Sequence, residues 1–236
     1  MTQIITAITT GVAAFIATNL DDILILTLLF TRVNPLFRRR HIVIGQYLGF
    51  SLLLVASLTG FCGSFLIPVE WIRYLGLIPV ILGIMALVKG EDGEEENVEI
   101  DAGAVNRFPL GRWLSPQTFG VAALTVANGS DNIGVYTPLF ASSSLPNLMA
   151  IVSVFLSLVG VWCFTAYKLT SLPAGARGWR SQIATLLNDQ GATFVPCVLI
   201  GLGVFIIKEN IPLAFLALGT SYLWALSNRE NGSESV

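Results

Sequence analysis

Apolar runs separated by short polar connections make up most of this chain, and this pattern constrains its fold more than any other feature. A helix that crosses the hydrocarbon core of a membrane needs about 20 mostly apolar residues. Only 12% of the residues are charged and the mean hydropathy is +0.74, which is far more apolar than a soluble domain. We therefore predict an all-α polytopic membrane protein whose main partner is the lipid bilayer.

The lengths of the apolar runs predict seven transmembrane helices. A single helix over 192–226 would be about 50 Å long. Because Lys208, Glu209 and Asn210 would interrupt that helix, two helices are predicted there instead. The seven predicted spans are 4–30, 42–67, 71–88, 119–141, 148–167, 192–207 and 211–226.

Lys and Arg residues are distributed unevenly over the connections between these spans. Cationic loops stay on the cytoplasmic side of a membrane. With seven spans, 11 of the 13 Lys and Arg residues fall on one side, and only Arg73 and Lys208 fall on the other. The sequence therefore predicts an N-terminus outside and a C-terminus in the cytoplasm.

One long acidic connection divides the chain into two comparable halves. It holds seven of the 15 acidic residues, which is typical of a flexible, solvated linker, and a cation-gathering or regulatory segment is the alternative. The predicted organisation is a first three-helix repeat at 1–88, an acidic cytoplasmic linker at 89–116, a second, inverted three-helix repeat at 117–210, and an extra helix with the C-terminal tail at 211–236.

The two halves resemble each other most at residues 21–30 and 131–140. At this offset of 110, Asp, Ile, Thr, Leu and Phe recur at matching positions. Because each repeat has three spans, the second copy enters the membrane upside down, and inverted repeats hold their substrate near the membrane midplane on broken helices. The predicted fold class is therefore two inverted three-helix repeats plus a C-terminal helix.

Three aspartates lie well inside predicted spans. An Asp at the centre of a lipid-facing helix costs about 2.5 to 3.5 kcal/mol, so these side chains should face a polar interior. Residues three apart share a helix face, so Asn19 with Asp22, and Asn128 with Asp131, predict two oxygen-rich half-sites for a divalent cation. The predicted metal site comprises Asn19, Asp21, Asp22, Asn128, Asp131 and Asn132.

The register between the two halves changes at the polar residues. Asn19 and Asn128 are 109 positions apart, one fewer than the offset downstream. Local unwinding at Gly129 and Ser130 would absorb the extra residue and free backbone carbonyls for coordination. Other polar residues have suitable side chains to line a path but receive no assigned role: Thr18, Thr27, Gln46, Tyr47, Tyr136 and Thr137.

Several other functions are disfavoured. The isolated cysteines Cys62, Cys163 and Cys197 lie in apolar runs, which is typical of buried small residues rather than of disulfides or a zinc site. The sequence has no basic stripe of the kind that binds nucleic acid, and it has no Gly-Lys-Ser/Thr loop of the kind that binds a nucleotide. Asp131 follows Asn-Gly-Ser, unlike the signature of aspartyl intramembrane proteases. We expect neither enzymatic activity nor a cofactor, and whether the chain forms a homo-oligomer stays open.

Three segments carry a resemblance to a known family: 18–23 (TNLDDI), 45–50 (GQYLGF) and 127–136 (ANGSDNIGVY). They are similar to the bacterial cadmium-resistance transporter family, a branch of the lysine-exporter superfamily. The resemblance implies a secondary transporter in the bacterial plasma (inner) membrane that exports a divalent metal such as cadmium. It also implies a core of two inverted three-helix halves.

The leading hypothesis is an exporter in which Asp21, Asp22 and Asp131 bind the cation, which is the substrate, and at least one carboxylate is reprotonated from outside as the metal leaves. Oxygen donors suit manganese, calcium or magnesium better than soft cadmium. Export of another cation, such as manganese, calcium or zinc, or of a small amino acid is therefore the alternative. A purely structural polar network is the third reading.

Overall fold

The computed structural model describes residues 2–66, 68–89, 115–170, 194–207 and 211–233. These residues form helices and their connections, with no strand among them. Most of the acidic linker and the basic residues Arg177 and Arg180 lie outside the described residues. The labelled helices of the first half are α1 (Thr2–Asn19), α2 (Asp22–Thr31), α3 (Arg39–Gly63), α4 (Val69–Tyr74) and α5 (Leu77–Lys89). Those of the second half are α7 (Pro116–Asn128), α8 (Asn132–Ala141), α9 (Leu145–Thr170) and α11 (Ile211–Ser233), with one further helix at Phe194–Ile207.

Within the described residues, each of the seven predicted spans is mostly helix, and three of them are divided in two. The first consists of α1 and α2, which meet at 59°. The third consists of α4 and α5, and the fourth of α7 and α8. Two single helices, α3 and α9, are long and apolar enough to cross a membrane, and the bent pair α1–α2 makes a third candidate span. The all-helical class is confirmed, whereas the count of seven spans stays a prediction because the remaining apolar helices are shorter.

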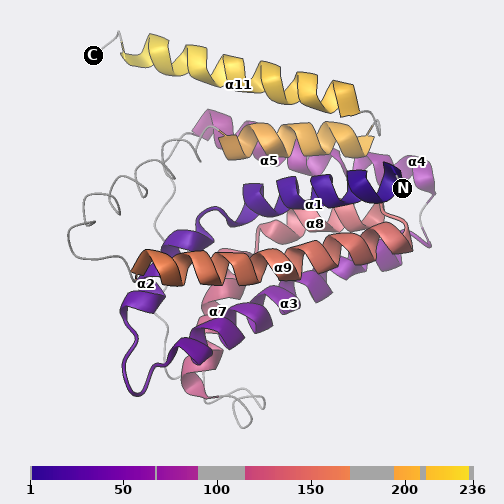
Figure 1. Cartoon of the computed structure of the whole chain (residues 1–236). Coiled ribbons are helices and arrows are strands. Elements are labelled where there is room, and N and C mark those ends of the chain that lie inside the picture. The colour runs from indigo at the N-terminus through magenta and orange to yellow at the C-terminus, as the bar shows by residue number, and fades with distance from the viewer. Residues whose placement is uncertain (1, 67, 90–114, 171–193, 208–210, 234–236) are drawn as a thin grey trace.

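Helices α3 and α9 connect the two halves of the chain. Helix α3 of the first half packs against α7 and α8 of the second, and α9 of the second half packs against α1 and α2 of the first. Figure 1 shows α1, α9 and α3 running side by side, with α11 at the edge of the molecule. The packing is reciprocal, because the third helix of each half, α3 or α9, packs against the broken helix pair of the other half.

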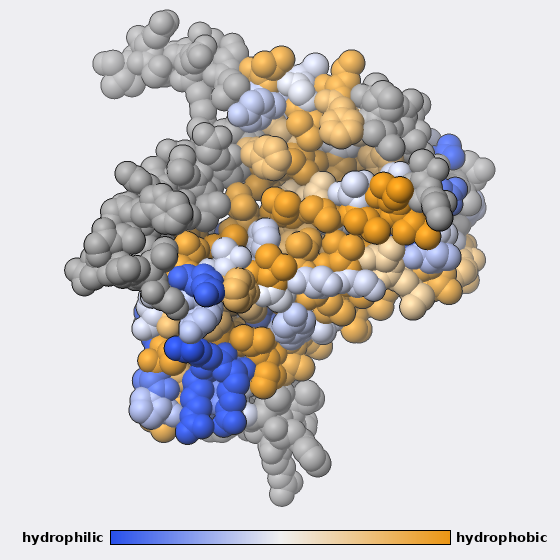
Figure 2. Space-filling view, viewed as in Figure 1, coloured by the Kyte–Doolittle hydropathy of each residue, from blue (hydrophilic) through white to orange (hydrophobic). Residues whose placement is uncertain are grey.

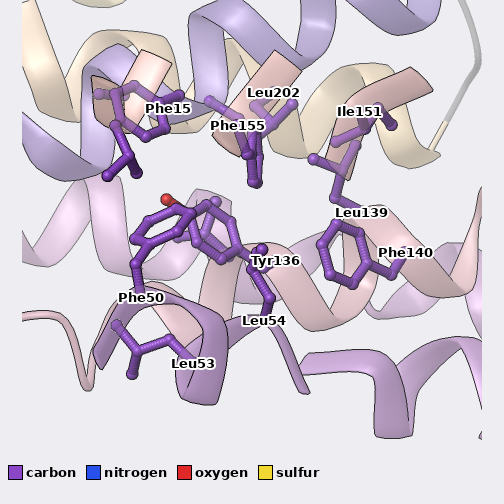
Figure 3. Close-up of a cluster of buried hydrophobic side chains, with 14 of the residues drawn as sticks. Phe15, Phe50, Leu53, Leu54, Tyr136, Leu139, Phe140, Ile151, Phe155 and Leu202 are labelled. Carbon is purple, nitrogen blue, oxygen red and sulfur yellow. The ribbon is translucent and has the colours of Figure 1, made fainter. Parts of the chain in front are cut away.

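Aromatic rings fill the centre of the bundle. Phe15 of α1, Phe50 of α3, Tyr136 of α8 and Phe155 of α9 are all buried. Their ring centroids lie between 4.7 and 6.2 Å apart, which is the usual range for aromatic packing. Figure 3 shows these four rings converging from different helices. Because helices in lipid associate through close packing and hydrogen bonds, this cluster holds the two halves against each other.

The outer surface is largely apolar, and charge is concentrated at one end. Figure 2 shows hydrophobic residues over most of the visible face and a hydrophilic patch at one end of the molecule. At the start of α3, the guanidinium of Arg39 donates to the hydroxyl of Tyr167 at 2.7 Å and lies 4.4 Å from its ring centre. Side chains such as Leu52 and Met149 are exposed on the flanks of α3 and α9, where they can contact lipid.

Candidate functional site

Both halves interrupt a helix at their polar motif. Helix α1 ends at Asn19 and α2 begins at Asp22, while α7 ends at Asn128 and α8 begins at Asn132. The second break therefore holds one residue more than the first, because Gly129, Ser130 and Asp131 separate its helices. The prediction that unwinding at Gly129 and Ser130 absorbs the change of register is confirmed.

Asp21 and Asp131 occupy equivalent positions in the two breaks. Each is the N-cap of the helix that follows, with φ and ψ of -68° and -29° at Asp21 and of -69° and -27° at Asp131. The two helices that they precede have ten residues each. Asp21 accepts a bond from the backbone N–H of Asp22, whereas the side chain of Asp131 makes no capping bond. The offset of 110 thus corresponds to a matching local structure in both halves.

Asn128 connects the second break to the carboxylates of the first. Its amide nitrogen donates to Oδ1 of Asp22 at 2.9 Å and to Oδ2 of Asp21 at 3.1 Å. Asp22 is buried with 6% of its surface exposed, and Asp21 is exposed. One amide group from the second half thus bridges two neighbouring carboxylates of the first half.

A second amide reaches Asp22 from α3. Nε2 of Gln46 donates to Oδ2 of Asp22 at 3.0 Å, and the hydroxyl of Thr125 on α7 lies 2.7 Å from Oε1 of Gln46. Both Gln46 and Thr125 are buried. Hydrogen bonds to a charged acceptor contribute about 1.5 to 3 kcal/mol, so Gln46 fixes the orientation of Asp22.

Two glycines allow α3 to approach α7 closely enough for this arrangement. A Cβ at Gly45 would lie 2.6 Å from Cβ of Val121, and one at Gly49 would lie 2.6 Å from Cβ of Thr125. Real Cβ atoms do not come so close to other heavy atoms, so only glycine permits this separation of the helices. The spacing Gly45-Gln46-x-x-Gly49 therefore places the Gln46 amide and two positions without a Cβ at the interface between α3 and α7.

Behind the carboxylates lies a buried polar network around Tyr136. The Asn19 amide nitrogen donates to the Tyr136 hydroxyl at 2.7 Å, and the Thr18 and Tyr136 hydroxyls lie 2.6 Å apart. The amide of Asn132 donates to Oδ1 of Asn19 at 3.4 Å, and the indole of Trp162 donates to the backbone oxygen of Asn19 at 2.6 Å. This network joins α1, α8 and α9 beside the two helix interruptions.

The predicted half-sites differ from the observed hydrogen bonds. Asn19 would share a face with Asp22, and Asn128 with Asp131, only on an uninterrupted helix. Because each helix ends at its Asn, the faces on the two sides of a break point in different directions. Asn19 bonds instead with Tyr136 and Asn132, and Asn128 crosses to the opposite half.

Some contributors to the site carry weak signals in the sequence. The sequence pattern does not single out Thr125 or Trp162, although an indole N–H inside an apolar span must find an acceptor. Gln46, Thr18 and Tyr136 are polar residues whose partners the sequence does not indicate. Their partners on other elements are 24 to 118 positions away along the chain, so only the packing of the helices reveals them.

The carboxylates do not form a closed set of metal ligands. Within the described part of the chain, no three His, Cys, Asp and Glu side chains are grouped as a metal centre would need. Cys62 is exposed, and Cys163 and Cys197 are buried. Cys163 lies on α9, the helix that packs against α2. Any cation at the break would therefore draw on carboxylate and amide oxygens together with backbone carbonyls of the unwound residues.

Apolar helices of membrane-spanning length, together with carboxylates held at two facing helix interruptions, define a helical membrane protein of the transporter class. A family model described as cadmium resistance transporter matches residues 15–218, and the chain belongs to that family. The match includes both helix breaks and α3. Comparisons with curated proteins and with solved structures give no match.

Proposed function

We propose that this chain exports a divalent metal cation of the cadmium type from the cytoplasm, and that Asp21, Asp22 and Asp131 hold the cation in transit. The observation that carries the proposal is the bridge from Asn128 to Asp21 and Asp22, which joins the carboxylates of one helix break to the other break. Carboxylates at this depth are costly, and a passing cation would offset their charge.

The polar side chains near the carboxylates fall into two sets, those that bond to Asp22 and those that bond to one another. Asn128 and Gln46 donate directly to Asp22, while Asn132 donates to Asn19, which in turn donates to Tyr136. We assign the cation to the carboxylates and to the oxygens of the break residues. Asn19 and Asn132 then hold the two helix ends in place beside the cation path.

The two halves act as inverted repeats in this proposal, with the acidic linker between them on the cytoplasmic side. The reciprocal packing of α3 on α7–α8 and of α9 on α1–α2 supports a two-fold relation between the halves. Alternating access then arises when one half rocks against the other around the carboxylates. As the cation leaves on the outer side, a proton from outside replaces it on at least one carboxylate.

The placement of basic residues supports an inward-facing C-terminus in a bacterial inner membrane. Arg39 at the start of α3 contacts Tyr167 near the end of α9, so these two helix ends lie together. Arg73 belongs to α4, which follows the opposite end of α3. This separation agrees with a cytoplasmic end that is rich in cations and an outer end that is poor in them.

The donor atoms also favour a second candidate, export of a harder cation. The groups that contact Asp21 and Asp22 are amides and a backbone N–H, and the oxygens that they leave for a cation are hard ligands. Manganese and calcium prefer such oxygens, whereas cadmium prefers thiolates. Competition between these ions in a single transport assay separates the two candidates.

The test is cation efflux from proteoliposomes loaded with cadmium or manganese. Asp22→Asn and Asp131→Asn keep the size of each side chain and remove its charge, so we expect both to reduce efflux at least tenfold while the variants still elute as folded protein. Glu70→Gln, in α4 at the end of α3 opposite Arg39, serves as the charge-loss control. Efflux at the unmodified rate in both Asp variants would refute the site.

A further inference from the structure

The four carboxylate oxygens of Asp21 and Asp22 are each engaged by an N–H donor. Oδ1 of Asp21 accepts from the backbone N–H of Asp22, and Oδ2 of Asp22 accepts from Gln46. The two remaining oxygens, Oδ2 of Asp21 and Oδ1 of Asp22, share a single donor, the amide nitrogen of Asn128. That nitrogen therefore lies between the carboxylates, at the point where a cation would contact both of them.

The two side-chain amides differ in how firmly they are held. The amide oxygen of Gln46 receives the hydroxyl of Thr125, so Gln46 is anchored at both ends. Both hydrogen bonds of the Asn128 side chain among the described residues come from its nitrogen. Nothing in the described part of the chain holds its oxygen, so Asn128 can turn away at the cost of these two bonds alone.

We propose that the amide nitrogen of Asn128 occupies the place that the cation takes between Asp21 and Asp22, and that it leaves when the cation binds and returns to expel the cation. Gln46 stays on Asp22 throughout as the fixed donor. This role rests on the proposed function, because it describes how the same carboxylates exchange their substrate. It assigns Asn128 to release rather than to binding.

The exchange also couples the cation to the movement of the two halves. Asn128 ends α7 in the second half, whereas its acceptors lie in the break between α1 and α2 of the first. While Asn128 bridges the carboxylates, the two breaks are joined. A cation that displaces the amide removes one link between the two breaks and leaves the bond from Asn132 to Asn19, and the returning amide restores the link after release.

The inference predicts opposite effects on affinity and rate in Asn128→Ala. Two hydrogen bonds to charged acceptors no longer compete with the cation, so the Kd for cadmium should fall at least tenfold. Efflux at saturating cadmium should fall by a similar factor, because a substrate that is bound too tightly leaves slowly. A residue that is merely a ligand would instead weaken binding when removed, and a structural one would lower stability without tightening binding.

The experiment measures cadmium binding by isothermal titration and efflux from proteoliposomes on the same preparations of the full chain. Asn128→Ser provides a second variant whose shorter side chain retains a polar group in case the alanine variant does not fold. Gln46→Leu is the matched control, because loss of a donor that stays in place should not tighten binding. Asp22→Asn reports on the proposed function itself and should abolish high-affinity binding.

The outcomes separate the two proposals. Tighter binding with slower efflux in both Asn128 variants, and no tightening in Gln46→Leu, supports the exchange role. If Asp22→Asn loses binding and the Asn128 variants also bind more weakly, the exchange role is overturned while the cation site stands. If Asp22→Asn binds cadmium as well as the unmodified chain does, the proposed function itself fails.

Discussion

The amide nitrogen of Gln46 lies 3.0 Å from Oδ2 of Asp22, and this bond ties the long helix α3 to the interruption between α1 and α2. Both residues are buried, so water competes poorly for the two groups. The contact explains why a polar side chain follows Gly45 within an apolar span. The orientation of the Asp22 carboxylate therefore also depends on how α3 packs against α7.

Thr125→Val tests whether the interface between α3 and α7 controls the orientation of the Asp22 carboxylate. Valine keeps the shape of threonine but removes the hydroxyl that lies 2.7 Å from Oε1 of Gln46, so the Gln46 amide can rotate and turn its oxygen toward Asp22. We expect cadmium binding to weaken by about tenfold, which corresponds to the roughly 1 to 1.5 kcal/mol of one hydrogen bond. Thr125→Ser, which retains the hydroxyl, should bind like the unmodified chain. Equal affinities in the two variants would contradict the role of Thr125.

Gly49→Ala tests the close approach of α3 and α7. The added Cβ would lie 2.6 Å from the carbonyl oxygen of Ala122 and from Cβ of Thr125, so the helices must separate. Overpacking of this kind costs about 1 to 3 kcal/mol, and we expect a clear fall in the apparent melting temperature in detergent. Gly219→Ala on α11 is the control, because its Cβ meets nothing within 4 Å. Alanine is favoured over glycine in a helix, so this control should melt at the same temperature or higher, and equal losses in both variants would refute the packing argument.

Cys62 provides a test of membrane orientation. It is exposed one residue before the end of α3, whereas Cys163 and Cys197 are buried. With the N-terminus outside, the end of α3 faces outward, so a membrane-impermeant maleimide should label intact cells at Cys62. Cys62→Ser should remove the label. Labelling that requires permeabilised cells would reverse the proposed orientation.

The repeated motif shows how far a sequence comparison reaches in this protein. The match of 21–30 with 131–140 predicts corresponding elements, and α2 and α8 begin at residues 22 and 132 with the same length. The mismatch in offset upstream predicts the extra unwound residue, which the structure places at Gly129–Asp131. Asn19 and Asn128 are equivalent in sequence yet differ in their contacts. Both side chains reach the opposite half, but Asn19 bonds with Tyr136 and Asn132, whereas Asn128 bonds with Asp21 and Asp22.

By itself, the sequence determined the helical class, the positions of the apolar helices and the unwinding at Gly129 and Ser130. These properties depend on local composition: apolar runs form helices in lipid, and Asp, Asn and Gly interrupt them. Only the tertiary structure decided which amides meet which carboxylates, because that depends on how closely α3 approaches α7 and on the direction in which each helix leaves its break. Gln46 and Asn128 reach Asp22 across 24 and 106 positions, and Thr125 reaches Gln46 across 79, separations that no local pattern encodes.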